Sequence, residues 1–164
     1  MLKRLQENAR TDRANGTIVR PVEIILDNTY ATKAKAFVLD AQREVRVCAY
    51  AWRWYDSEPE LILQQFNIEL LRAARRGVQV RVLVDTEAMA RRFAALGFNV
   101  RAVQPTRMLH TKALVIDDKT LVIGSHNLTK RANTDNYEIS VAIQDYESVA
   151  QFIAYFDALW GSRG

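Results

Sequence analysis

Short β-rich runs alternate with helical segments along the first part of this chain, and this alternation constrains its fold more than any other feature. The runs rich in Val, Ile and Leu predict strands over residues 22–26, 44–50, 78–84 and 98–103. The segments between them predict helices over residues 30–42, 59–76 and 87–96. A strand that leads through a helix into another strand usually runs parallel to it. The pattern therefore predicts an α/β fold with a mixed, largely parallel β-sheet covered by helices on both faces.

Residues that start or stop helices stand where this pattern needs them. The predicted helix starts carry proline or side chains that accept hydrogen bonds from free backbone N–H groups, at Asp27-Asn28-Thr29, Pro59 and Asp85-Thr86. The predicted ends of the second and third helices are each followed by a glycine, at Gly77 and Gly97.

The remainder of the chain departs from this rhythm. Strands are predicted over residues 109–116 and 120–123, joined by the tight turn 117–119. Because a turn this short reverses the chain, these two strands must be antiparallel neighbours. Beyond them the pattern predicts a strand and then an amphipathic helix capped by Asp145, over residues 137–143 and 146–160.

The length of 164 residues predicts one folded unit, large enough for a single core and too short for two. Residues 1–20 are expected to form a polar N-terminal extension, with a short helix over residues 2–10. Residues 21–164 are expected to form the folded domain.

The cysteine and histidine counts exclude several classes of protein. One cysteine and two histidines cannot supply a disulfide framework and offer few ligands for zinc, so no metal or other cofactor is expected, although a site made of carboxylates alone stays open. The lone Cys48 lies within an apolar run and is expected to be buried and unreactive. No apolar run approaches the roughly 20 residues of a membrane span, and no secretory signal is visible, so a cytoplasmic location is expected.

Positive charge is concentrated in one part of the chain. The net charge is +4, but residues 72–107 hold eight arginines against two acids, whereas residues 133–164 have a local net charge of −4. A basic surface of this kind suits a polyanion such as nucleic acid or an anionic membrane. The alternative is that these arginines are simply solvated on helix faces.

Polar residues that could take part in catalysis cluster around the predicted hairpin. His110 and Lys112 are two apart in one strand and are expected on the same face, and Ser125 and Asn127 share a face after the next strand. Antiparallel pairing brings the two pairs together. A neutral imidazole can attack phosphorus while an ammonium, an amide and a hydroxyl hold the phosphoryl oxygens, so this set suits a phosphodiester without a metal.

Other polar residues are expected to support this set. Glu138 could accept a hydrogen bond from the His110 imidazole and fix its tautomer. Asp117 falls on the other face and is expected to order the turn. His126 also falls on the opposite face from Ser125 and Asn127, so it is not expected to take part.

The spacing His110-x-Lys112-x4-Asp117-x6-Gly124-Ser125-x-Asn127 resembles the HxKxxxxDxxxxxxGSxN signature of the phospholipase D superfamily. The resemblance implies a phospholipase D-like half-domain, with residues 21–164 as the catalytic domain and Asp117 and Gly124 as structural positions of the motif. It also implies a mechanism with two histidines, one forming a phosphohistidine and the other protonating the leaving oxygen. Because the chain holds one copy of the motif, the resemblance implies a homodimer with a shared active site.

Family members with a single motif include small bacterial endonucleases and a mitochondrial lipid hydrolase or nuclease with a membrane anchor. The arginine block and the lack of a visible anchor favour a weakly sequence-specific endonuclease acting on DNA or RNA. Further substrate contacts are expected from the aromatic loop after the second strand and from the residues after Asn127, namely Trp52, Arg53, Lys130 and Arg131. The aromatic loop could instead form a lid or dimer contact, and the last two residues could be solvated.

Two other functions remain open on the sequence. A phospholipase D or transphosphatidylase would use the same five polar residues on a phospholipid. A nucleic-acid-binding module of a larger defence or restriction assembly would bind without efficient hydrolysis, although the complete motif speaks against it. The choice between DNA, RNA and lipid, the strand and sequence preference, the cleavage polarity and any protein partner stay open.

Overall fold

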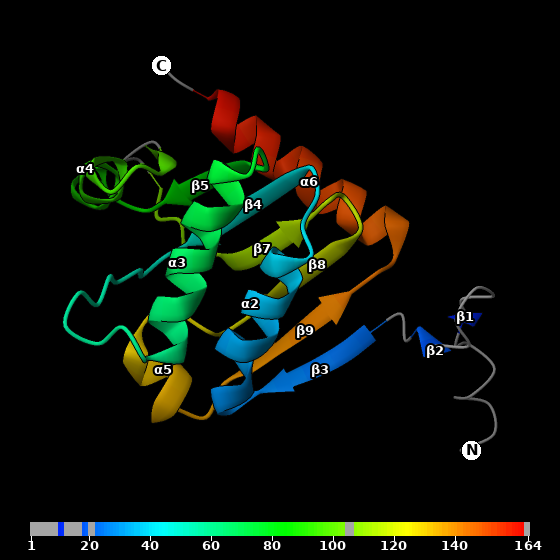
Figure 1. Cartoon of the computed structure of the whole chain (residues 1–164). Coiled ribbons are helices and arrows are strands. Elements are labelled where there is room, and N and C mark those ends of the chain that lie inside the picture. The colour runs from blue at the N-terminus through cyan, green and yellow to red at the C-terminus, as the bar shows by residue number, and fades with distance from the viewer. Residues whose placement is uncertain (1–9, 12–17, 20–21, 104–106, 163–164) are drawn as a thin grey trace.

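The computed structural model describes residues 10–11, 18–19, 22–103 and 107–162. Its centre is a seven-stranded sheet in the order β3-β9-β8-β7-β4-β5-β6 (Figure 1). The strands are β3 (Val22–Leu26), β4 (Glu44–Ala49), β5 (Gln79–Val84), β6 (Asn99–Ala102), β7 (Lys112–Ile116), β8 (Thr120–Gly124) and β9 (Ile139–Ile143). The predicted mixed sheet of an α/β fold is confirmed.

The balance of parallel and antiparallel pairing differs from the sequence prediction. Only β4–β5 and β5–β6 are parallel, whereas β3–β9, β9–β8, β8–β7 and β7–β4 are antiparallel. β3 and β4 do point the same way, as a strand–helix–strand connection predicts. However, the hairpin strands β7 and β8, together with β9, insert between them, so they are not neighbours. Local sequence predicts the relative direction of β3 and β4, but it does not predict that strands from further along the chain lie between them.

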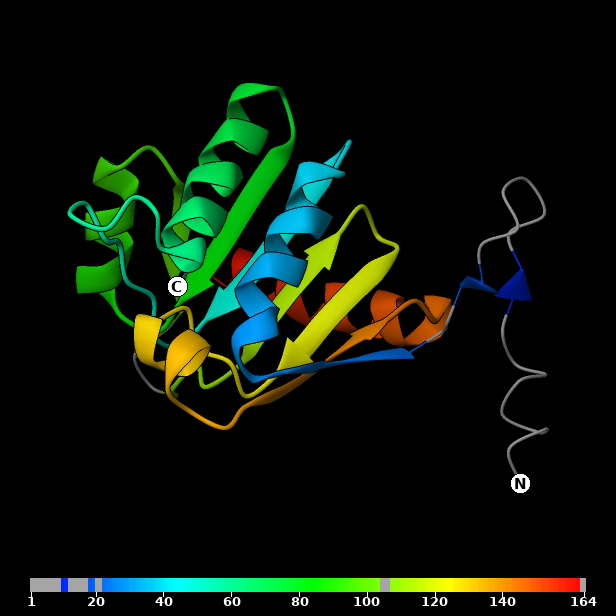
Figure 2. The same ribbon diagram turned by 60° about the horizontal axis from the view of Figure 1, so that its bottom comes forward.

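Helices cover both faces of the sheet, as predicted. α2, α3 and α4 pack on one face and α6 crosses the other, which is clearest when Figures 1 and 2 are compared. The helices are α2 (Tyr30–Leu39), preceded by the 3-10 helix η1 (Asp27–Thr29), α3 (Ile62–Arg75), α4 (Glu87–Ala95), α5 (Lys130–Thr134) and α6 (Tyr146–Gly161).

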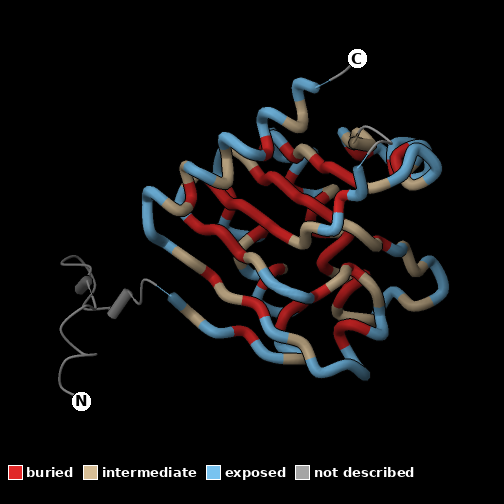
Figure 3. Tube along the Cα trace, turned by 180° about the vertical axis from the view of Figure 1, so that it is seen from behind, coloured by how far each residue is buried: buried red, intermediate tan, exposed pale blue. Residues whose placement is uncertain are grey.

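The sheet separates two apolar layers. In β7, Leu114 and Ile116 join the core beneath α2 and α3, whereas Ala113 and Val115 join the core beneath α6. Figure 3 shows the buried residues running along the central strands. Burial on both faces explains why the central strands are apolar at successive positions instead of alternating.

Most of the predicted helix boundaries have the expected physical cause. Thr86 Oγ1 accepts a hydrogen bond from Met89 N at 3.3 Å, and the Asp145 carboxylate accepts one from Ser148 N at 2.9 Å. Gly77 and Gly97 adopt positive φ angles of 97° and 98°, which side chains disfavour and glycine permits. The helix predicted from Pro59 begins only at Ile62, in α3.

The cap predicted at residues 27–29 is wrong. These residues form η1, and no side-chain cap bond is made at the start of α2, because Thr29 Oγ1 donates instead to Leu26 O at 2.6 Å. The Asp27 carboxylate accepts from Glu138 N. Of the N-terminal extension, only Arg10–Thr11 and Ile18–Val19 are described, as the antiparallel strands β1 and β2. The helix predicted over residues 2–10 otherwise lies outside the described residues.

Candidate active site

The polar residues singled out by the sequence gather at one edge of the sheet. β4 and β8 end at this edge, and β7 and β9 begin there, because β8 pairs antiparallel with both its neighbours and β7 pairs antiparallel with β4. Tyr50 and Ser125 follow the ends of β4 and β8, while His110 and Glu138 precede the starts of β7 and β9. Four segments far apart in the sequence therefore meet.

His110 and Lys112 are in direct contact. Lys112 Nζ lies 3.1 Å from both ring nitrogens of His110 and donates a hydrogen bond to the His110 carbonyl oxygen at 2.8 Å. The predicted strand is shorter than expected, since β7 begins at Lys112 and His110 lies just before it. The imidazole is exposed, so it can be reached by a ligand.

Tyr50 is a residue of this site that the sequence analysis missed. Its ring centroid lies 4.5 Å from that of His110, and Lys112 Nζ lies 4.9 Å from the Tyr50 ring centroid. A cation over an aromatic face is attracted by the ring electrons. Tyr50 was visible as the last residue of a predicted strand, but only the pairing of β4 with β7 shows which residue it meets.

Glu138 and Ser125 form the second polar pair. Ser125 Oγ donates to the Glu138 carboxylate, and Ser125 N donates to Ile139 O at 2.9 Å. Asn136, which the sequence analysis also missed, donates from Nδ2 to Glu138 Oε1 at 2.9 Å. In the single chain the Glu138 carboxylate thus contacts Ser125 and Asn136, and its pairing with His110 stays a prediction.

Charge couples the two pairs. Partial burial lowers the pKa of the Lys112 ammonium below that of an ordinary lysine, and the negative charge of Glu138 opposes this shift. The carboxylate therefore helps to keep Lys112 protonated beside His110. A cation held in this way can neutralise the oxygens of a bound phosphate.

Asn127 is held by its backbone, and its side-chain oxygen is not bonded. Asn133 Nδ2 donates to Asn127 O at 3.1 Å, and the next residue, Leu128, donates from its backbone N to Ala51 O at 3.0 Å. Within the described part of the chain, Asn127 Oδ1 is buried without a hydrogen-bond partner. A buried polar atom without a partner is costly and is characteristic of a functional position.

Gly124 and Asp117 have structural roles in this geometry. A Cβ on Gly124 would lie 2.3 Å from Ile139 O, so no side chain fits where β8 passes β9. The Asp117 carboxylate lies at the opposite end of β7 and accepts hydrogen bonds from three successive backbone N–H groups at 2.7–3.0 Å, those of Gln42, Arg43 and Glu44. Burial alone would raise the pKa of Asp117, but these bonds outweigh it and lower the pKa.

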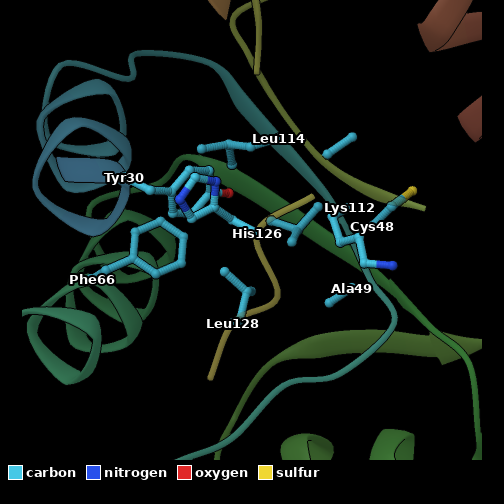
Figure 4. Close-up of a pocket in the computed structure, with 10 residues that line it drawn as sticks. Tyr30, Cys48, Ala49, Phe66, Lys112, Leu114, His126 and Leu128 are labelled. Carbon is cyan, nitrogen blue, oxygen red and sulfur yellow. The ribbon is translucent and has the colours of Figure 1, made fainter. Parts of the chain in front are cut away.

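His126 points away from the exposed edge, as the sequence predicts. It is 1% exposed, and its ring stacks on Tyr30 with centroids 4.5 Å apart. Figure 4 shows this pair, with the Lys112 amine directed away from it. Nε2 lies 2.9 Å from Asp27 O, and since a carbonyl only accepts, Nε2 carries the proton. Burial lowers the pKa of His126 and favours the neutral ring.

The prediction that Trp52 contacts substrate is wrong. Trp52 is only 3% exposed, its ring stacks on Phe93 at 3.6 Å, and Nε1 donates to Asn67 Oδ1 at 2.8 Å. A side chain with these contacts cannot stack on an incoming base. The position of Trp52 in a loop after a strand predicts exposure, but the loop places its ring against α3 and α4.

The basic residues predicted to contact substrate differ in whether an acidic side chain of the described residues pairs with them. Arg53 and Arg131 are exposed, whereas the Lys130 ammonium pairs with Glu58, and the hydrogen bond to Glu58 and its negative charge raise the Lys130 pKa. Part of the arginine block is also neutralised inside the fold, because Arg81 pairs with Glu44 and Asp157. The exposed members of that block are Arg72, Arg75, Arg76, Arg91, Arg92 and Arg107.

A groove of about 640 Å³ adjoins His110 on the α6 side of the sheet. Its wall is mainly apolar, from Val103, Leu109 and Leu159, with Arg107 and Tyr155 also lining it. The Tyr155 hydroxyl lies 3.4 Å from Thr111 Oγ1. A ligand whose phosphate contacts His110 thus has room for a flanking group. Cys48, by contrast, is buried as expected, and burial raises its pKa to about 12, which disfavours the reactive thiolate.

Comparison with known proteins agrees with this geometry. Residues 35–160 match a family described as a cardiolipin synthase, PLD-like domain. The chain belongs to the phospholipase D superfamily. The resemblance carried by the motif from His110 to Asn127 is therefore confirmed.

Relatives in the superfamily are named for different activities. The chain is 31% identical over 129 residues to the mitochondrial cardiolipin hydrolase of Mus musculus, covering 75% of this chain and 54% of that one. It is 37% identical over 112 residues to the 5'-3' exonuclease PLD3 of Xenopus tropicalis, covering 62% of this chain and 22% of that one. The chain thus spans about half the length, or less, of these relatives.

A solved structure shares the fold. Nuc from Salmonella typhimurium, described as a phospholipase D family member, superposes with a TM-score of 0.68 and 22% identity, over 85% of this chain and 94% of that one. At this identity the likeness supports the fold alone. None of the helices in the described residues is long and apolar enough to cross a membrane.

Proposed function

We propose that this protein hydrolyses phosphodiesters, and that it is an endonuclease with weak sequence specificity acting on DNA or RNA. The observation that carries the proposal is the exposed His110 imidazole with Lys112 Nζ at 3.1 Å from both ring nitrogens, beside a groove with room for the substrate. A nucleophile next to a cation is what attack on an anionic phosphodiester requires.

The proposed reaction has two steps. A ring nitrogen of His110 attacks phosphorus, a P–N bond forms, and the P–O bond to the leaving alcohol breaks as a second histidine donates a proton to that oxygen. Lys112 Nζ and Asn127 Nδ2 donate to the non-bridging oxygens, and Ser125 Oγ does so once its proton turns from the Glu138 carboxylate to the substrate. Water, deprotonated by the second histidine, then attacks the phosphohistidine and releases the phosphate monoester. No metal ion or other cofactor takes part.

The second histidine comes from a second copy of the chain in this proposal. His110 is the one exposed histidine in the described residues, because His126 is buried. Apolar side chains also remain exposed on the β3 and β9 surface next to Glu138, namely Val22, Ile24, Leu26 and Ile139. A homodimer with both sites in one cleft accounts for the single motif and for this surface.

Charge supports nucleic acid as the substrate. The exposed arginines, among them Arg53, Arg131 and, in the groove, Arg107, suit a chain of phosphates. Such contacts address phosphate rather than base edges, so weak sequence specificity follows. We further propose that residues 21–164 form the catalytic domain and that the protein acts in the cytoplasm.

A phospholipid is the second candidate substrate, and the identity to the mitochondrial cardiolipin hydrolase favours it. The same His110, Lys112, Ser125, Asn127 and Glu138 would act on a lipid phosphodiester as a phospholipase D or transphosphatidylase. A nucleic-acid-binding module without hydrolysis remains the third candidate.

One substrate panel separates these candidates. Purified protein is incubated with plasmid, single-stranded DNA, RNA and labelled phospholipid, each with EDTA present. Cleavage of nucleic acid is expected, and acid-labile phosphate should be trapped on His110. Cleavage of lipid alone would overturn the choice of substrate, dependence on a metal would overturn the mechanism, and binding without cleavage would favour the third candidate.

A further inference from the structure

Asp27 contacts two segments of the candidate active site from a distant part of the sequence. Its carboxylate Oδ1 accepts a hydrogen bond from Glu138 N at 2.9 Å, and its own N–H donates to Glu138 O at 3.0 Å. Both backbone polar groups of Glu138 are therefore bonded to one residue. Two hydrogen bonds to the same residue restrict the position of Glu138 more than one bond would.

The third contact of Asp27 reaches His126. Asp27 O accepts from His126 Nε2 at 2.9 Å, and His126 Nδ1 lies 2.8 Å from Ser140 Oγ. His126 stands between Ser125 and Asn127 in the chain. Asp27 thus holds Glu138 on one side and the loop that carries Ser125 and Asn127 on the other.

The backbone of Asp27 is itself in an unfavourable conformation. Its φ angle is +47°, in the left-handed region that most side chains avoid and that Asn and Asp tolerate best. Strained backbone persists when surrounding contacts require it, and it is concentrated at functional sites. Here the strained turn places the carboxylate and both backbone groups of Asp27 against Glu138 and His126.

We propose that Asp27 is a positioning residue that holds Glu138 and the Ser125–Asn127 loop in their reactive arrangement. The inference rests on the proposed phosphodiester hydrolysis, but not on the choice between nucleic acid and lipid. Asp27 also lies outside residues 35–160, the segment matched by the family. Asp27 contacts Glu138 and His126, and it acts on the site through these two residues.

Three substitutions separate the carboxylate from the backbone conformation. Asp27→Asn keeps an oxygen acceptor and tolerates the left-handed conformation, whereas Asp27→Gly keeps that conformation and removes the acceptor. Asp118→Gly is the matched control, because Asp118 is also left-handed, with φ +56°, but lies in the turn at the opposite end of β7. Thermal unfolding of all three corrects for losses of stability.

Hydrolysis of bis(4-nitrophenyl) phosphate measures the effect without favouring either natural substrate. Asp27→Gly should lower kcat by about 10- to 100-fold with KM changed by less than about twofold, since misplacement of a supporting group slows chemistry more than binding. Asp27→Asn should restore most of kcat. An unchanged kcat in Asp27→Gly, or an equal loss in Asp118→Gly, would overturn the proposal.

A second readout does not depend on activity. Amide hydrogen exchange at Glu138 and the ¹⁵N shifts of the His126 ring report the two contacts directly by NMR. In Asp27→Gly, exchange at Glu138 should become faster, and in Asp27→Asn it should stay slow. Slow exchange at Glu138 in both variants would overturn the inference, whether or not the wild-type protein hydrolyses phosphodiesters. Absence of hydrolysis by the wild-type protein would separately overturn the proposed function.

Discussion

The two ends of the β7–β8 hairpin both carry polar residues of the motif, but the bonding partners of these residues differ between the ends. At the turn, Asp117 accepts three backbone N–H bonds, and Asp118 pairs with Arg43 and Arg46. At the other end, His110 is exposed, and the direct contacts of Lys112 within the described part of the chain are with the neutral Tyr50 ring and with His110.

This difference separates stability from function. Charges at the turn end are compensated within the chain, so they stabilise the fold without needing a ligand. Among the described residues, no carboxylate forms an ion pair with His110 or Lys112 at the exposed edge, which leaves these two side chains available to a phosphate. One sequence motif therefore has a structural end and a chemical end.

Replacement of His110 should give the largest effect and the clearest support for the chemical end. His110→Ala removes the nucleophile, so kcat should fall by about 10³-fold or more while the unfolding free energy changes little. Steady-state hydrolysis and denaturant unfolding measure the two quantities. Lys119→Ala, an exposed change at the turn end, is the control and should keep full activity. Near-normal kcat in His110→Ala would break the comparison.

Asp117→Ala should show the opposite pattern at the structural end. Three backbone N–H groups lose a charged acceptor, so the unfolding free energy should fall by about 2–4 kcal/mol while kcat of the folded protein is kept. Because the Asp117 pKa is lowered in the folded state, its contribution is present at neutral pH and is lost as pH falls below about 4. Urea unfolding at several pH values measures this, and loss of kcat with unchanged stability would contradict the assignment.

The pKa of Lys112 should depend on Glu138. Glu138→Gln removes a negative charge that raises this pKa, so the Lys112 ammonium should lose its proton at lower pH than in the wild-type protein. NMR titration of the Lys112 side chain measures the shift. Glu147→Gln, an exposed change in the first turn of α6, is the control. An upward shift in Glu138→Gln would show that the two groups are not coupled as described.

His126 should give the smallest effect. Burial lowers the pKa of His126, so the unfolded state binds more protons than the folded state below about pH 6.5. The unfolding free energy should therefore decrease as the pH is lowered through that range. The slope is at most about 1.4 kcal/mol per pH unit for one group. Urea unfolding from pH 7 to pH 5 should show a shallower slope in His126→Asn. An identical slope would mean that His126 is not the group responsible.

The sequence predicts the elements and the motif well because both depend on local spacing. The strand–helix alternation, the glycines at 77 and 97 and the family resemblance of the run from His110 to Asn127 are all confirmed. The strand order could not be predicted from local sequence, because β7, β8 and β9 lie between β3 and β4 through long-range pairing.

Residues that depend on this long-range pairing were misread or missed. The sequence predicts that Trp52 contacts substrate, but Trp52 is buried against Phe93, and Tyr50 joins the site only because β4 pairs with β7. The sequence around Asp27 predicts a helix cap, because Asn28 and Thr29 follow it. The actual partners of Asp27, Glu138 and His126, are about a hundred residues away in the chain.

The central claim is that one chain supplies half of an active site, and subunit mixing tests it most directly. Wild-type protein and His110→Ala are mixed in equal amounts, exchanged, and checked for mixed dimers by native mass spectrometry. If both histidines of a dimer are required, total activity should fall to about one quarter of the same total amount of wild-type protein. Activity of about one half, or a fully active monomer by sedimentation, would contradict the claim.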